Sequence, residues 1–143
     1  MSEIRFVVPA VPVAQPRQRH AIIAGHVRNF TPSDHPVQAF KATVRMAASA
    51  AYDGPPLEGA LSMFALFVMP RPKAKTKKRG GNPRYHHTGR PDVDNLMKSL
   101  ADSLKGLCWN DDSQIAMSDI RKCVAAADEQ PHVTVLINTL TGY

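Results

Sequence analysis

The chain has 143 residues, 43% of them hydrophobic, and a formal net charge of +6, which favours a single domain, 1–143, large enough to bury a core but small for two domains. It holds no apolar run of about 18 residues and its opening residues already carry charge, so we expect neither a membrane span nor a signal peptide and place the protein in the cytoplasm. The positive charge indicates a polyanionic partner.

The first residues predict a strand and a candidate hairpin. Residues 4–8 form a short apolar, β-branched run that ends at Pro9 and is typical of a strand. Further prolines favour an extended basic linker over residues 15–20. Beyond it, the two apolar runs on either side of Gly25, within residues 21–30, are a candidate for a hairpin.

A long helix is expected next. The turn 31–33 offers an N-cap, and apolar residues then recur at helical spacing, which predicts a helix from Asp34 to Tyr52. Lys41 and Arg45 lie one turn apart on this helix. They could contact nucleic acid, or they could simply keep that face of the helix hydrated.

A buried strand and a basic segment follow. Residues 60–69 are almost wholly apolar, as expected for a strand covered on both faces. Residues 71–90 then hold eight of the eighteen basic residues and no acid. Because this segment has no apolar period, we expect a mobile loop that becomes ordered on binding, with a solubilising insertion as the alternative. Within it, His86 or His87 could contact phosphate and Tyr85 could stack on a base or pack internally.

The densest set of polar residues surrounds a second helix. Pro91 disfavours helical geometry at Arg90, so the helix should begin near Asp92 or Asp94, and Gly106 is a plausible stop. Residues 92–112 contain five of the twelve acids. One face of this helix is apolar and the other is a charged stripe. The stripe consists of Asp94, Lys98, Asp102 and Lys105, and Asp102 is expected to pair with one of the two lysines.

Two final strands complete the expected fold, over residues 115–124 and 132–140. The economical architecture is a compact α/β (α+β) layer in which two main helices pack against a mixed sheet of about four to six strands. Cys108 and Cys123 lack the spacing of a zinc site and are expected to be buried free thiols.

The clustered acids point to a metal ion. Carboxylates about 4 Å apart repel by roughly 1 to 4 kcal/mol per pair, so a cluster needs a compensating cation. Oxygen ligands without patterned cysteine or histidine favour a hard divalent ion, and Mg²⁺ fits best. Lys98, one turn after Asp94, could then steady a phosphate or a leaving oxyanion. A capped helix with a surface ladder of charges is the alternative, and the spacing alone does not decide between them.

The run Pro91-Asp-Val-Asp-Asn-Leu-Met-Lys98, followed by Trp109-Asn-Asp-Asp-Ser-Gln114, resembles the RusA family of Holliday-junction resolvases from bacteria and phages. The resemblance implies a homodimeric, Mg²⁺-dependent endonuclease, with Mn²⁺ as a substitute, that acts on four-way DNA junctions. It implies metal ligands at Asp92, Asp94 and Asp112 and a catalytic lysine at Lys98. Asn95 and Asp111 are expected to support these ligands. The expected DNA contacts are Arg17, Arg19, Lys73, Lys75, Lys77, Lys78, Arg79 and Arg90.

The route by which Asp112 reaches the other two aspartates stays open. The second helix is about 18 Å long, and the six residues after Gly106 span about 20 Å when extended, so a return within one chain is just within reach. Supply of Asp112 from a partner subunit is the other option. The number of metal ions, one or two, is also open. Two symmetric nicks in a two-fold junction favour a homodimer.

Two rival functions stay under consideration. One is a Mg²⁺-dependent nuclease that prefers flaps or linear duplex to junctions. The other is a non-catalytic nucleic-acid binder in which the acids only cap helices and keep the surface soluble. Cleavage of a synthetic junction, compared with cleavage of a matched duplex, separates both from a resolvase.

Overall fold

A computed structural model describes residues 2–16, 19–77 and 80–143, with Arg19 and His20 described by their backbone alone. Within these described residues, two helices and seven strands follow one another, with two single 3-10 turns between them. The elements are β1 (Glu3–Val8), β2 (Arg19–Ile23), β3 (His26–Phe30), α1 (Pro36–Ala51), β4 (Leu61–Met69), η1 (Lys73–Lys75), β5 (Tyr85–His86), α2 (Val93–Leu104), η2 (Asp112–Gln114), β6 (Ile115–Val124) and β7 (His132–Thr139).

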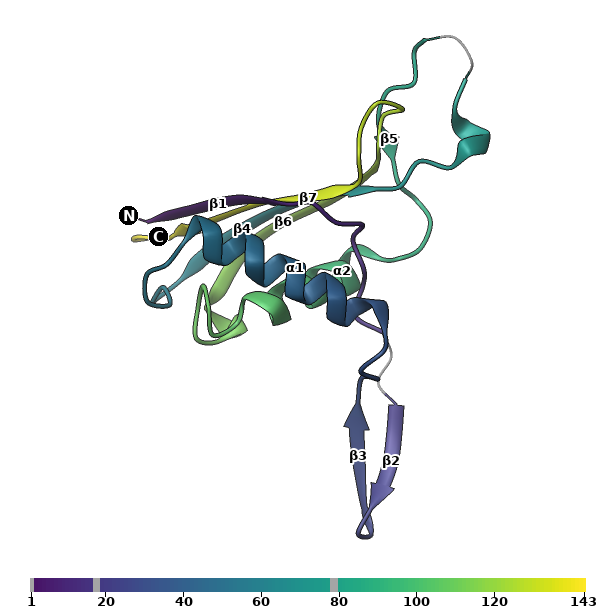
Figure 1. Cartoon of the computed structure of the whole chain (residues 1–143). Coiled ribbons are helices and arrows are strands. Elements are labelled where there is room, and N and C mark those ends of the chain that lie inside the picture. Colours follow the sequence, from purple (N-terminus) through teal and green to yellow (C-terminus); the bar gives the residue numbers. More distant parts are fainter. Residues whose placement is uncertain (1, 17–18, 78–79) are drawn as a thin grey trace.

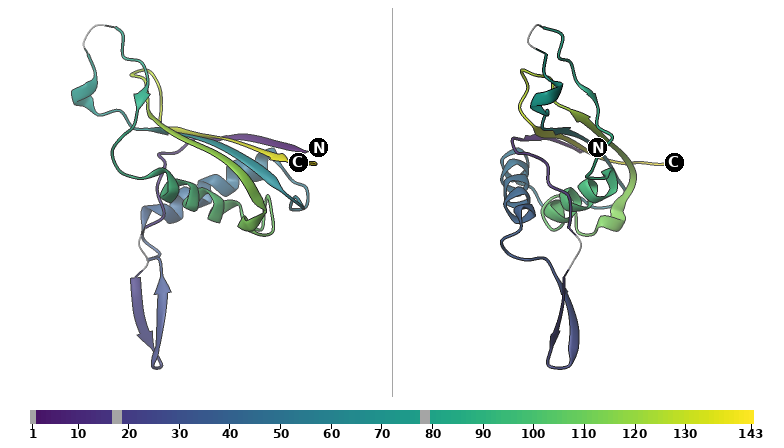
Figure 2. Two further views of the ribbon diagram at one scale, coloured as in Figure 1. Left: turned by 180° about the vertical axis from the view of Figure 1, so that it is seen from behind. Right: turned by 90° about the vertical axis from the view of Figure 1, so that its right-hand side faces the viewer.

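Five strands form one mixed sheet in the order β1-β7-β4-β6-β5, and β2 pairs with β3 in a separate two-stranded sheet. β4 runs parallel to β6, whereas the other pairs in the large sheet are antiparallel. Both helices lie on one face of the large sheet (Figures 1 and 2). This arrangement confirms the predicted α+β class, with two main helices against a mixed sheet.

The core lies between the sheet and the helices because alternate residues of the strands point the same way. β1 buries Ile4, Phe6 and Val8, and these pair in register with Ile137, Val135 and Val133 of β7. The helices contribute one apolar stripe each, with Phe40 and Val44 from α1 and Leu96, Leu100 and Leu104 from α2. The two stripes close the core on the side of the sheet that they cover.

The expectation that β4 is covered on both faces is wrong. Its burial alternates along most of its length, and Phe64 and Leu66 are only half-buried. The reason is that both helices pack on the same side, so no helix of the described residues covers the opposite face of the sheet (Figure 2). The continuous apolar run of β4 therefore reflects a half-buried strand of an α+β sheet.

The helix ends agree with the predicted positions to within two residues. α2 begins after Asp92 and ends before Gly106, whose φ of 85° only glycine adopts readily. α1 is capped by His35, whose Nδ1 accepts a hydrogen bond of 3.0 Å from the backbone N–H of Val37. The cap is thus not within the 31–33 turn, because that turn ends two residues before the N-cap position.

Two further expectations can be compared with the described residues. Cys108 and Cys123 are buried free thiols, as predicted, and burial raises the pKa of Cys108 to about 11. None of the described helices is long and apolar enough to span a membrane.

Candidate functional site

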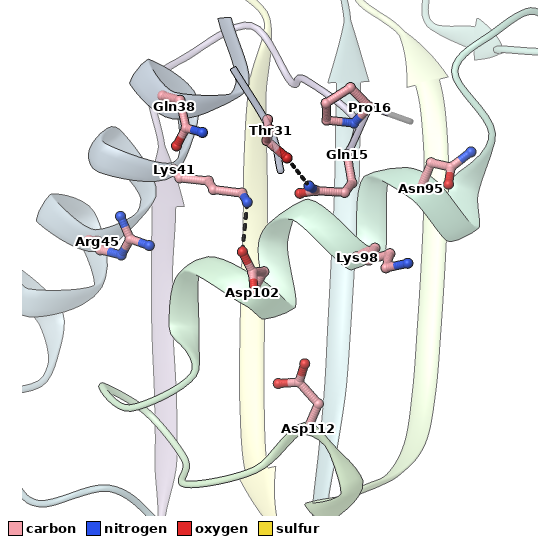
Figure 3. Close-up of a pocket in the computed structure, with 10 residues that line it drawn as sticks. All are labelled: Gln15, Pro16, Thr31, Gln38, Lys41, Arg45, Asn95, Lys98, Asp102 and Asp112. Atoms are coloured by element: carbon pink, nitrogen blue, oxygen red, sulfur yellow. Dashed lines mark hydrogen bonds and ion pairs between the residues drawn. The ribbon is translucent and has the colours of Figure 1, made fainter. Parts of the chain in front are cut away.

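A cavity of about 900 Å³ opens between α1 and α2, on the side of the helices away from the sheet (Figure 3). Its wall is polar and comes from both helices, from the proline-rich segment after β1, and from η2. The lining residues are Gln15, Pro16, Thr31, Gln38, Lys41, Arg45, Asn95, Lys98, Asp102 and Asp112. The cavity therefore brings together Asn95, Lys98 and Asp112, three of the residues that the sequence singled out.

The proline-rich segment is fixed to the start of α2. The backbone N–H of Gln15 donates to the carbonyl of Asn95 at 3.0 Å, and the Ser99 hydroxyl donates to the carbonyl of Val13 at 2.6 Å. The side-chain amide of Gln15 also donates to the Thr31 hydroxyl at 3.4 Å. These bonds hold the segment that leads into β2, and the residue that follows β3, against the rim of the cavity (Figure 3).

An ion pair between Lys41 of α1 and Asp102 of α2 crosses the cavity, with 2.6 Å between Nζ and Oδ2 (Figure 3). Asp102 was expected to pair with Lys98 or Lys105, and that prediction is wrong. α1 packs along α2, so the buried Lys41 side chain reaches Asp102 across the helix pair. Lys98 consequently makes no hydrogen bond or ion pair with the described residues and presents its ammonium group to the cavity.

The loop after α2 is built to hold Asp112. The buried indole of Trp109 donates from Nε1 to Oδ1 of Asp112 at 2.7 Å. Gln114 accepts from the backbone N–H groups of Asn110 and Asp111, and its amide donates to the carbonyls of Leu57 and Gly59. The Trp-Asn-Asp-Asp-Ser-Gln run therefore forms a locked turn whose exposed carboxylate points into the cavity (Figure 3).

Asp111 serves this turn and does not line the cavity. Its Oδ1 accepts from the backbone N–H of Ser113 at 2.9 Å, completing a reciprocal cap with Gln114. The bonds from Ser113 lower the pKa of the Asp111 carboxyl below its usual range. Asp111 therefore supports Asp112 by fixing the backbone on either side of it.

Asp92 and Asp94 lie at the start of α2 but not among the residues that line the cavity. Both side chains are exposed, and Asp92 makes no capping bond with its side chain. The turn that carries them is held from β6, because Lys122 donates from Nζ to the carbonyls of Gly89 at 2.6 Å and Pro91 at 2.8 Å. The positions of Asp92 and Asp94 are therefore set by the start of α2 and by the hydrogen bonds from Lys122 to the preceding turn.

The described residues of one chain do not bring three carboxylates together. Among residues 2–16, 19–77 and 80–143, no three histidine, cysteine, aspartate or glutamate side chains lie close enough to hold one ion. Asp112 faces the cavity from one end, whereas Asp92 and Asp94 lie outside its wall. The described residues of one chain therefore supply at most part of the predicted ligand set.

The basic segment 71–90 folds around Arg71. Its guanidinium donates to the carbonyls of Lys75, Pro83 and Ala125 and lies 5.4 Å over the Tyr85 ring. Farther along, Arg84 forms a bidentate ion pair with Glu129 in the turn between β6 and β7. The Tyr85 ring contacts Arg71 but is itself exposed, so the choice between base stacking and internal packing stays open, and the predicted mobility of the segment stays a prediction.

The remaining predicted DNA contacts fall into two groups. Lys73, Lys75, Lys77 and Arg90 are exposed. Arg17, Lys78 and Arg79 lie outside the described residues, and Arg19 is described only by its backbone. His86 is exposed, whereas burial and the nearby Lys122 lower the pKa of His87 and favour its neutral form.

For two lysines the sequence analysis missed the structural role, because it considered Lys41 only as a surface or nucleic-acid-contacting residue and did not single out Lys122. Lys41 occupies a position on the apolar stripe of α1 between Val37 and Val44, and Lys122 sits between Ile120 and Val124 on the helix-facing side of β6. A lysine at a core-facing position is the signal that could have found both, because a buried ammonium group needs an acceptor.

Comparison with known proteins identifies relatives over nearly the whole chain. A family model described as "Endodeoxyribonuclease RusA" matches residues 9–138. The protein named "Uncharacterized protein YqaN" of Bacillus subtilis (strain 168) is 32% identical over 147 residues, an alignment that covers 99% of this chain and 100% of that protein. Both sequence runs around the candidate site lie inside the region that the family model matches.

Proposed function

The chain belongs to the RusA endodeoxyribonuclease family, and from this premise we propose that it is a structure-specific DNA endonuclease that resolves four-way (Holliday) junctions by paired symmetric nicks. The observation that carries the proposal is the family match over residues 9–138, which includes both acidic runs. The cavity between the helices supports it, because its polar wall includes both Lys98 and Asp112.

In this proposal, the residues of the chain have distinct tasks. Lys98, whose ammonium group has no internal partner among the described residues, binds a phosphate oxygen of the DNA strand. Asp92, Asp94 and Asp112 are the carboxylates that would hold the metal ion. The exposed lysines of segment 71–90 attract the phosphate backbone toward them.

Mg²⁺ dependence, with Mn²⁺ as a substitute, is part of the proposal. When bound, such an ion supplies Lewis-acid activation of water and phosphate. Because one chain does not bring three acidic ligands together in its described part, we propose that the ligand set is completed across a homodimer. A two-fold dimer also presents two equivalent sites to a two-fold junction, which paired nicking requires.

The decisive experiment uses a labelled synthetic four-way junction and a linear duplex of the same sequence, each incubated with Mg²⁺ or with a chelator. We expect symmetric nicks confined to the branch point in the presence of Mg²⁺ alone. Equal cutting of the duplex would instead identify a nuclease with another preference. Binding without cutting under Mg²⁺ and Mn²⁺ would identify a non-catalytic binder.

Asp94→Asn tests the catalytic assignment separately from binding. We expect loss of cleavage while junction binding persists or tightens, because the substitution removes repulsion between a carboxylate and the phosphate backbone. Gel-shift and nicking assays on the same junction measure both effects. Asp53→Asn, at an exposed acid in the loop after α1, is the matched control and should cut normally. Normal nicking by Asp94→Asn would remove Asp94 from the mechanism.

A further inference from the structure

The β2–β3 hairpin projects from the body of the protein beyond the helix layer (Figures 1 and 2). It exposes apolar side chains, which do not stabilise a hairpin that stands alone in water. Ile22 and Val27 are cross-strand partners on one face, and they are 78% and 67% exposed. An isolated two-stranded hairpin is marginally stable in water, so this apolar face is built to meet a partner.

The tip of the hairpin is narrow. Ala24 and Gly25 connect the strands with φ values of 53° and 81°, the pattern of a two-residue turn in which both central residues are left-handed. Asn-Gly is the usual choice there, and an alanine at positive φ costs about 1 kcal/mol or more. The alanine keeps the turn small and free of polar side chains, directly beside Ile22, Ile23 and Val27.

Charge and position together identify the partner. Residues 19–30 contain two arginines, two histidines and no acid, so the hairpin complements a polyanion. Its two ends leave the body at Pro16 and Thr31, which line the same cavity as Lys98 and Asp112. The hydrogen bond between Gln15 and Thr31 closes the base of the hairpin at this rim. The base of the hairpin therefore adjoins the cavity in which a DNA strand would bind.

We propose that the β2–β3 hairpin is a wedge that inserts its apolar tip between the bases at the branch point of the bound junction. Apolar side chains inserted between base steps unstack them and distort the DNA. The unstacking cost is smallest where stacking is already interrupted, as at the centre of a junction, so the wedge favours branched over linear DNA. At about 3.3 Å per residue, five-residue strands place the tip roughly 17 Å from the cavity rim.

This inference rests on the proposed function, and its test is designed so that the two can fail separately. The protein is bound, in chelator, to a junction with thymines flanking the branch point, and permanganate, which oxidises unstacked thymines, reports their exposure. The double variant Ile22→Ser/Val27→Ser is compared with wild type. Met46→Ser, at a comparably exposed residue on α1, is the matched control.

We expect wild type and Met46→Ser to raise thymine reactivity at the branch point, and the double variant to leave it at the level of free DNA. The double variant should also lose roughly tenfold in its preference for junction over duplex. Duplex affinity and thermal midpoint should stay near those of wild type, because the replaced side chains are exposed.

Thymine reactivity equal to that of wild type in the double variant would overturn the wedge. If the double variant had half the molecular mass of wild type in solution and unchanged thymine reactivity, the hairpin would be a contact between two copies of the chain. That result would also overturn the wedge. Failure of wild type to cut any junction in Mg²⁺ would instead refute the proposed function, since the permanganate measurement is made without metal.

Discussion

The ion pair across the cavity is asymmetric at the level of its residues. The side chain of Lys41 is 7% exposed, whereas that of Asp102 is 55% exposed. Loss of the lysine leaves a carboxylate that water can solvate, but loss of the carboxylate leaves a buried ammonium group without its partner. The two members therefore contribute unequally to the stability of the helix pair.

Asp102→Asn is accordingly expected to lower the free energy of unfolding by about 1 to 3 kcal/mol. Lys41→Met should cost less than about 1 kcal/mol, because methionine fills a similar volume without a charge. Urea denaturation of both variants and of the double variant measures the difference. The double variant should resemble Lys41→Met alone, and equal costs for the two single variants would show that the ammonium group is solvated.

Among the elements, the basic segment is attached to the sheet by the ion pair between Arg84 and Glu129. The Arg84 guanidinium lowers the pKa of Glu129 to about 2. A carboxyl with a lowered folded-state pKa stabilises the fold above its unfolded pKa of about 4.3, and this contribution disappears as the pH falls toward 2. The docking of segment 71–90 is thus expected to weaken in acid.

Glu129→Gln should therefore lower the free energy of unfolding by about 1 kcal/mol at neutral pH, a modest value because Arg84 is 43% exposed. The difference from wild type should shrink between pH 4.5 and pH 2 and vanish near pH 2. Denaturation at several pH values measures it. Asp128→Asn, at an exposed acid of the same turn, is the control, and a constant difference for Glu129→Gln would contradict the linkage.

The same segment is expected to contribute counterion release on DNA binding. Replacing Lys73, Lys75 and Lys77 by glutamine should flatten the slope of log K against log salt by up to about 2 to 3 units, if each lysine contacts a phosphate. Binding titrations on duplex at several salt concentrations measure the slope. Arg5→Gln, on the sheet face without helices, should change it little. An unchanged slope for the triple variant would show that these lysines do not contact phosphates and that the segment is only a spacer.

Local patterns predicted the elements better than they predicted the contacts between them. The start of α2 after Asp92 followed from Pro91, and the hairpin followed from Gly25, because both depend on neighbouring residues. The partner of Asp102 and the role of Lys122 depend on how α1, α2 and β6 pack, which sequence spacing does not encode. The bare face of β4 was missed for the same reason.

At the scale of the whole molecule, the separation of Asp112 from Asp92 and Asp94 bears on how many chains make one site. If ligands come from two chains, a dimer of Asp94→Asn with Asp112→Asn contains one damaged pair and one intact pair. If each site takes all of its ligands from one chain, both sites of the mixed dimer are damaged. Mixing the two inactive variants therefore separates these arrangements.

We expect the mixture to recover nicking, with roughly a quarter of the sites active after random exchange of subunits. Each mixed dimer should cut one strand, leaving the junction nicked but unresolved. The products are counted on denaturing and native gels, with each variant alone as the control. A mixture that stays inactive, although light scattering shows mixed dimers, would place all ligands within one chain.

The bond from the Trp109 indole to Asp112 has a practical consequence. The chain contains one tryptophan, so all of its indole fluorescence comes from a buried ring whose polar edge faces Asp112. A cation or phosphate that draws this acid away alters the electric field at the ring, and with it the colour and intensity of the emitted light. The fold thereby provides a built-in optical reporter, and the arrival of DNA can be followed in real time in unlabelled protein.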